Sequence, residues 1–139
     1  MRDLVTYFEN LRDILLSPDP LSDFLREPQI SERDNQYGSL SLALSYLEGS
    51  QLYVELQADC EGEFPVWGDY GLQYLGPQHE LRFRYDNAPH HRELPNFPYH
   101  LHLSDDEVLT DGPPPIRGVA SAIRWHLDHP GRSWHPASL

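Results

Sequence analysis

Residues 39–57 read S-L-S-L-A-L-S-Y-L-E-G-S-Q-L-Y-V-E-L-Q, and this stretch decides the fold. Leucines at 40, 42 and 44 alternate with small residues, and Leu52, Val54 and Leu56 alternate with polar residues after a turn at 48–50. A period of two is typical of strands that bury one face. The stretch therefore predicts a β-hairpin with one apolar face and one polar face.

Apolar spacing on both sides of this hairpin predicts the remaining elements. The period of two continues at 66–75, 81–86 and 99–103, which predicts two more strands and a short edge strand. Helical spacing predicts an amphipathic helix at 2–16 and a second, led by proline, at 115–129. The fold class is therefore α+β in two layers: an N-terminal helix, a four- to five-stranded antiparallel meander, a proline-rich loop and a C-terminal helix.

The length of 139 residues fits one domain. Within this single domain, we expect four parts: a helical N-terminal segment at 1–36, a sheet with a histidine-rich loop at 37–103, a C-terminal helix at 115–129 and a tail at 130–139. In the first part, Leu21, Phe24 and Leu25 predict a second, short helical turn.

Composition and charge limit the function classes. The net charge is −12 and all ten basic residues are arginine, which works against an electrostatically driven nucleic-acid binder. No apolar run approaches the roughly 20 residues that a membrane helix needs, and acidic residues interrupt the N-terminal apolar pattern as they would not in a signal peptide. The single cysteine, Cys60, excludes an intramolecular disulfide. We therefore expect a cytoplasmic protein without membrane contact.

The residues best suited to chemistry gather where the strand at 81–86 ends. Four histidines follow within thirteen residues, and histidine is the side chain most easily poised for proton transfer near neutral pH. The candidate catalytic residues are Asp86, His90, His91, His100 and His102. The candidate substrate-binding residues are Arg82, Arg84, Tyr85 and Asn87.

Three interpretations of this cluster stay open. Histidines can act as acid and base on RNA beside an arginine that holds the phosphate. His100 and His102 lie two apart and share a strand face, so they could also bind a metal with His90 or Asp86. That spacing is common by chance, and we expect no metal and no cofactor. In the third interpretation the prolines stiffen a loop whose histidines bond backbone carbonyls.

Residues 82–103 read R-F-R-Y-D-N-A-P-H-H-R-E-L-P-N-F-P-Y-H-L-H-L. This run resembles the signature of the TumE-like family of prokaryotic toxins, in which a strand ending in R-Y-D-N is followed by A-P-H-H, a proline, F-P-x-H and a second histidine. The resemblance covers roughly residues 37–128 and includes the hairpin turn and the final helix led by proline.

The resemblance implies the toxic half of a two-gene module whose partner is a helix-turn-helix antitoxin. It also implies kinship with ribonuclease-type toxins, and hence metal-independent histidine chemistry on RNA. One position departs from the family pattern, since Gln73 stands where a histidine is expected. The alternative is therefore an inactive member, or a non-catalytic protein–protein interaction domain, that uses the same histidine-rich surface. Enzymatic activity and a homodimeric assembly both stay open.

Overall fold

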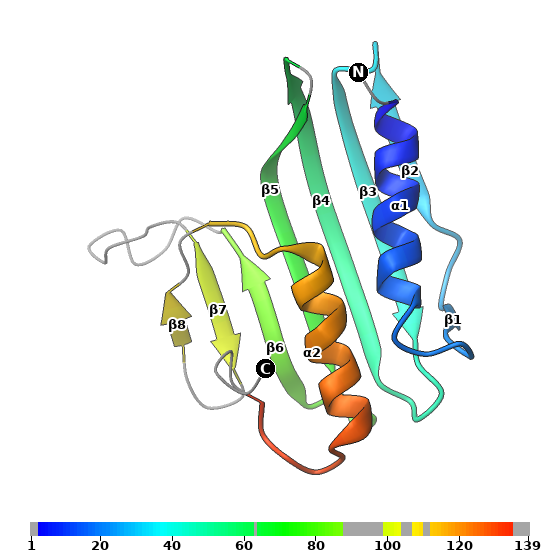
Figure 1. Cartoon of the computed structure of the whole chain (residues 1–139), viewed down its shortest axis with the longest axis vertical. Coiled ribbons are helices and arrows are strands. Elements are labelled where there is room, and N and C mark those ends of the chain that lie inside the picture. The colour runs from blue at the N-terminus through cyan, green and yellow to red at the C-terminus, as the bar shows by residue number, and fades with distance from the viewer. Residues whose placement is uncertain (1–2, 63, 88–98, 104–106, 110–111, 135–139) are drawn as a thin grey trace.

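The computed structural model describes residues 3–62, 64–87, 99–103, 107–109 and 112–134 (Figure 1). Within these ranges the chain forms two helices and eight strands. In chain order they are α1 (Leu4–Leu16), β1 (Asp23–Phe24), β2 (Gln29–Arg33), β3 (Tyr37–Ser45), β4 (Gln51–Glu61), β5 (Phe64–Leu75), β6 (Leu81–Asp86), β7 (His100–Leu103), β8 (Glu107–Leu109) and α2 (Ile116–Asp128).

The strands form one antiparallel sheet in the order β1-β3-β4-β5-β6-β7-β8, and β2 pairs with β3 on the same edge as β1. Strands β3 to β6 are the predicted meander, and β7 is the predicted edge strand with β8 added outside it. The prediction of an α+β fold in two layers is confirmed. The sheet is wider than predicted because short strands join it at both edges.

Two segments differ from the sequence prediction. The pattern of Leu21, Phe24 and Leu25 predicts a helical turn, whereas β1 pairs with the end of β3 at this point. The large side chains at 21, 24 and 25 are exposed, so no buried helical face forms here. Gly62 and Pro65 predict a loop at 59–65, but β4 and β5 continue pairing as far as Glu61 and Phe64. Pro65 is tolerated there because, among the described residues, β6 pairs with β5 only from Gly71 to Leu75, so the other side of β5 is a sheet edge at this point.

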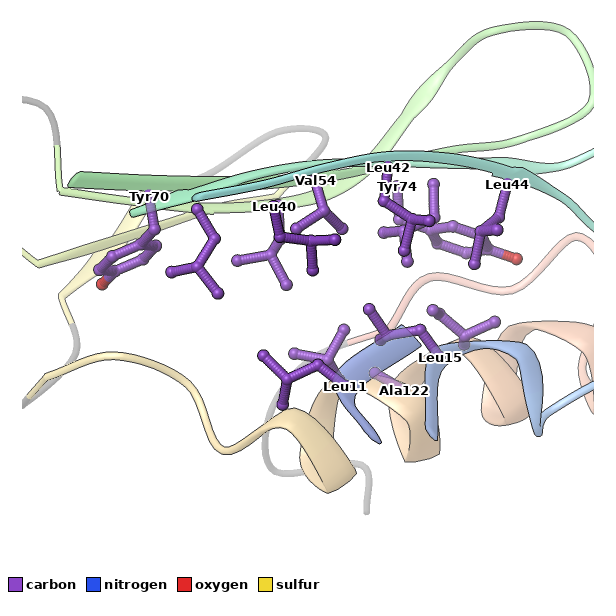
Figure 2. Close-up of a cluster of buried hydrophobic side chains, with 14 of the residues drawn as sticks. Leu11, Leu15, Leu40, Leu42, Leu44, Val54, Tyr70, Tyr74 and Ala122 are labelled. Atoms are coloured by element: carbon purple, nitrogen blue, oxygen red, sulfur yellow. The ribbon is translucent and has the colours of Figure 1, made fainter. Parts of the chain in front are cut away.

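Both helices cover the same face of the sheet (Figures 1 and 2). The predicted leucines of α1 are buried, and they meet alternate leucines of β3 and β4 together with Tyr70 and Tyr74 of β5. Helix α1 begins where the Asp3 carboxylate accepts the backbone N–H of Val5 at 3.1 Å. No helix in the described ranges is long and apolar enough to cross a membrane.

Gly38 brings α1 against the sheet. A Cβ atom at this position would lie 2.7 Å from Leu4 Cδ2, 2.8 Å from Phe8 Cε2 and 2.9 Å from the backbone oxygen of Ser31. The helix therefore approaches β3 more closely than any larger residue would permit. With both helices on one side, the polar alternate positions of β3 to β7 form the opposite surface, which we call the open face.

Candidate functional site

The candidate site is built by the pairing of β6 with β7. Asp86 lies opposite His100 and Arg84 lies opposite His102 in the antiparallel register. Because side chains alternate along a strand, these four residues share the open face. The sequence spacing predicts that His100 and His102 share a face, and the register adds the carboxylate and the guanidinium opposite them.

Asp86 lies at the centre of this group. Its Oδ2 atom accepts a hydrogen bond from Arg84 Nε at 2.8 Å. His100 Nδ1 lies 3.4 Å from Asp86 Oδ1, and His102 Nε2 lies 3.5 Å from Asp86 Oδ2. One carboxylate therefore faces three nitrogen-bearing side chains, and it fixes their relative positions.

Burial divides the group into an inner pair and an outer pair. The side chains of His100 and Asp86 are 0% and 6% exposed, whereas those of His102 and Arg84 are 25% and 39% exposed. Only the outer pair is accessible to a molecule in solution. His100 and Asp86 are consequently placed to orient the accessible groups rather than to meet a substrate directly.

Strand β5 supports Arg84 from the other side. Gln73 lies opposite Arg84, and its Oε1 atom accepts a hydrogen bond from Arg84 Nη1 at 3.3 Å. Gly71, opposite Asp86, leaves room for the guanidinium, since a Cβ atom there would lie 3.0 Å from Arg84 Nη2. The departure from the family pattern at position 73 therefore lies inside the site, where it holds the arginine.

A groove of about 710 Å³ extends from this group across the open face. Its charged lining residues are Glu55, Asp69, Arg84 and Asp86, so among the described residues carboxylates outnumber cations here. A second hollow of about 370 Å³ continues the groove toward β2, because Ser39 and Gln57 line both.

Sequence reasoning missed Glu55, which lines this groove, and Arg26, which contacts Glu55. Arg26 reaches over β3 from the segment between β1 and β2, and it donates hydrogen bonds to Ser41 Oγ at 2.8 Å and to Glu55 Oε1 at 3.3 Å. The alternation along β4 places Glu55 on the polar face and was the available signal. No sequence signal places Arg26, since its position depends on how the preceding segment crosses the sheet edge.

Two of the four predicted substrate-binding residues lie elsewhere. A bulge between β5 and β6 displaces Arg82, whose Nη1 donates to Tyr74 Oη at 3.2 Å and lies 3.7 Å from Glu48 Oε2. Arg82 thus joins the buried tyrosine rather than the Asp86 group. Tyr85 lies opposite Leu101 on the helix-facing side, where its ring contacts Phe83 and burial raises the pKa of its hydroxyl.

Asn87 lies beside the groove in a structural position. Its Oδ1 atom accepts the backbone N–H of Tyr70 at 3.0 Å, and its Nδ2 donates to the backbone oxygen of Gly68 at 2.9 Å. The side chain thereby replaces backbone pairing at the end of β6. The remaining predicted catalytic residues, His90 and His91, lie outside the described residues.

The buried Tyr70 contacts the same region from the helix-facing side. Burial raises the pKa of its hydroxyl, and Tyr99, Asp86 and Tyr85 raise it further through their charges. A neutral phenol beneath the site leaves the accessible pair, Arg84 and His102, to meet a negative charge on the open face.

The arrangement can also hold a metal ion. One ligand atom from each of Asp86, His100 and His102 lies within 4.8 Å of the others. The H-x-H spacing suggested two of these ligands, and strand pairing supplies the third. Among the described residues, this group therefore offers both acid–base side chains and a ligand set.

A comparison with protein-family models matches residues 13–129 to the family described as "Toxin TumE". Searches of curated proteins and of solved structures found no match. The matched range includes β3 to β7 and α2, and therefore the whole Asp86 group. A toxin family of this kind implies an antitoxin partner. Since the match covers far more than half of the sequence, the chain belongs to the TumE toxin family.

Proposed function

We propose that this toxin acts on RNA at the open face, with His102 and Arg84 as the groups that meet the substrate. The single observation that carries the proposal is the convergence of His102, Arg84 and His100 on one buried carboxylate, Asp86. A buried carboxylate that orients histidine is a recurring support for proton transfer. Action on RNA places the toxin in the cytoplasm.

His102 suits the role of general base. Its Nε2 faces Asp86, and a carboxylate at that nitrogen favours the neutral tautomer that carries its proton there and its basic lone pair on Nδ1. In RNA cleavage, that nitrogen takes the proton of a ribose 2′-hydroxyl. The 2′-oxygen then bonds to the adjacent phosphorus and the bond to the 5′-oxygen breaks, so the leaving oxygen must receive a proton.

Arg84 suits the phosphate. Its guanidinium is fixed by Asp86 Oδ2 and Gln73 Oε1, yet its side chain is 39% exposed. A cation held in place before the reaction stabilises the extra negative charge that develops on the phosphoryl oxygens. No metal ion enters this scheme. The acid that protonates the 5′-oxygen is assigned to the other histidines of the signature, His90 and His91.

The family membership supports a partner as well. We propose that a helix-turn-helix antitoxin binds this chain and neutralises it, as the family pattern implies. One observation favours a second candidate function, in which the chain binds a protein without catalysis. The groove is lined by Glu55, Asp69 and Asp86 against Arg84, and this acidic lining repels phosphate and fits a basic protein segment.

Cleavage of RNA by the purified chain in a chelating buffer separates the two functions. Catalysis by His102 predicts that His102→Gln lowers the rate about 100-fold or more, the usual range for acid–base groups. His129→Gln is the matched control, because His129 stacks on Trp125 at the end of α2, away from the strand pair β6–β7. Equal rates for all three proteins would remove His102 from the mechanism. Growth arrest without any RNA cleavage would favour the binding function.

A further inference from the structure

We propose that Asp86, His100 and His102 form a binding site for a transition-metal ion of the Zn²⁺ class. We further propose that the bound ion blocks acid–base use of His102. The second statement rests on the proposed function, whereas the first stands on geometry alone.

The separations between the ligand atoms fit a tetrahedral ion. Zinc lies about 2.1 Å from imidazole nitrogen and carboxylate oxygen, so two ligands of a tetrahedron are about 3.4 Å apart. The nitrogen–oxygen separations here are 3.4 Å from His100 Nδ1 to Asp86 Oδ1 and 3.5 Å from His102 Nε2 to Asp86 Oδ2, so each histidine lies at tetrahedral spacing from one of the two carboxylate oxygens. All three ligand atoms lie within 4.8 Å of one another, so small side-chain rotations bring them to one ion.

The ligand types select the class of metal. Two imidazoles and one carboxylate suit Zn²⁺, Fe²⁺, Ni²⁺ or Cu²⁺, whereas Mg²⁺ and Ca²⁺ prefer oxygen ligands alone. The ligands project from two paired strands, β6 and β7, and two of them are almost fully buried. A site on rigid strands loses little conformational freedom when the ion binds.

Arg84 opposes the metal. Its Nε lies 2.8 Å from Asp86 Oδ2, so its positive charge repels a divalent ion on the same carboxylate. The same residue attracts phosphate in the proposed reaction. Replacing Arg84 therefore has opposite effects on two measurements: metal binding strengthens and RNA cleavage weakens. This opposition distinguishes failure of the metal site from failure of the proposed function.

Titration of the metal-stripped chain with Co²⁺ tests the site, with absorption in the visible region reporting tetrahedral coordination. Calorimetry with Zn²⁺ gives the affinity. His102→Gln and Asp86→Asn each remove a ligand and are expected to weaken binding about 100-fold or more. Arg84→Gln is expected to tighten it about tenfold, because one repelling charge is removed. The control His129→Gln is expected to bind as the unaltered chain does.

The outcomes separate cleanly. Absence of binding by the unaltered chain overturns the site, as does binding that survives both His102→Gln and Asp86→Asn, because the ion then lies elsewhere. Weaker rather than tighter binding by Arg84→Gln also contradicts the geometry. The inhibitory part is measured by adding Zn²⁺ to the RNA assay, where the expected result is loss of cleavage that a chelator restores. Stimulation by Zn²⁺ would overturn that part alone.

Discussion

His126 makes the stability of this fold depend on pH in a way that can be worked out in advance. The side chain is 4% exposed in α2 and is surrounded by the rings of Tyr74, Phe83, Trp125 and Trp134. Its Nε2 atom has no hydrogen-bond partner among the described residues. Burial, and secondarily the charge of Arg82, lowers the pKa of His126 from its ordinary value of about 6.5 to about 4.

The sign follows from proton linkage. Between pH 6.5 and 4 the unfolded chain protonates this histidine and the folded chain does not, so the free energy of unfolding falls as the pH falls. Above pH 6.5 His126 is neutral in both states, so the folded chain keeps its full stability with respect to this group. Between pH 8 and pH 5 the loss attributable to His126 is about 2 kcal/mol, and it approaches about 3 kcal/mol at pH 4.

Urea unfolding of the unaltered chain and of His126→Leu at pH 8 and pH 5 measures this contribution. Leucine has a similar volume and no ionisable group, so the carboxylates common to both proteins cancel in the difference. Between pH 8 and pH 5, the free energy of unfolding of the variant is expected to rise by about 2 kcal/mol relative to that of the unaltered chain. Parallel losses in the two proteins would refute the buried, neutral state of His126. A substitution of the exposed His79 is the control, and it is expected to leave the change in unfolding free energy between pH 8 and pH 5 as in the unaltered chain.

Three further substitutions test the packing that carries the site, each measured by urea unfolding at pH 7. Gly38→Ala is expected to destabilise the fold by about 1–3 kcal/mol, because its Cβ meets α1 and a backbone oxygen; an unchanged midpoint would contradict that close approach. Asn87→Ala is expected to lower stability by about 1–3 kcal/mol, since it removes two hydrogen bonds to β5; Asn87→Asp, which keeps only the acceptor, should lose less. Ser50→Ala removes the buried acceptor of the Tyr74 hydroxyl at 2.8 Å and is expected to lower stability by about 1 kcal/mol, since Arg82 only donates to that hydroxyl and cannot accept its proton; an unchanged midpoint would contradict this.

The central fold was predictable because its strands bury one face and expose the other. Residues 39–57 alternate cleanly, and the pairing of β3 with β4 follows that alternation. Strand β2 was not predictable, since it lies at the sheet edge with nearly every side chain exposed and shows no period of two. Edge strands of this kind are defined by backbone pairing, which leaves little trace in residue type.

The site was predictable in part for the same reason. The H-x-H spacing places His100 and His102 on one face, but their contact with Asp86 depends on the register of β6 and β7. The separation of Arg82 from Arg84 depends on a bulge, which adds a residue without a distinctive sequence. The burial of His126 had an available signal, because it lies three residues after Ile123 on the apolar face of α2.

The two leucines of β7 also protect the site against a shift in strand register. Leu101 and Leu103 are buried on the helix-facing side, between and after the histidines of the open face. A slip by one residue would exchange the two faces, bringing both histidines into the apolar core and both leucines to the surface. Exposing two leucines alone costs about 3–6 kcal/mol. Burial of these leucines therefore disfavours the shifted register that would remove the histidines from the open face. Any sequence that preserves the core of β7 thereby also keeps its histidines on the same face as Asp86.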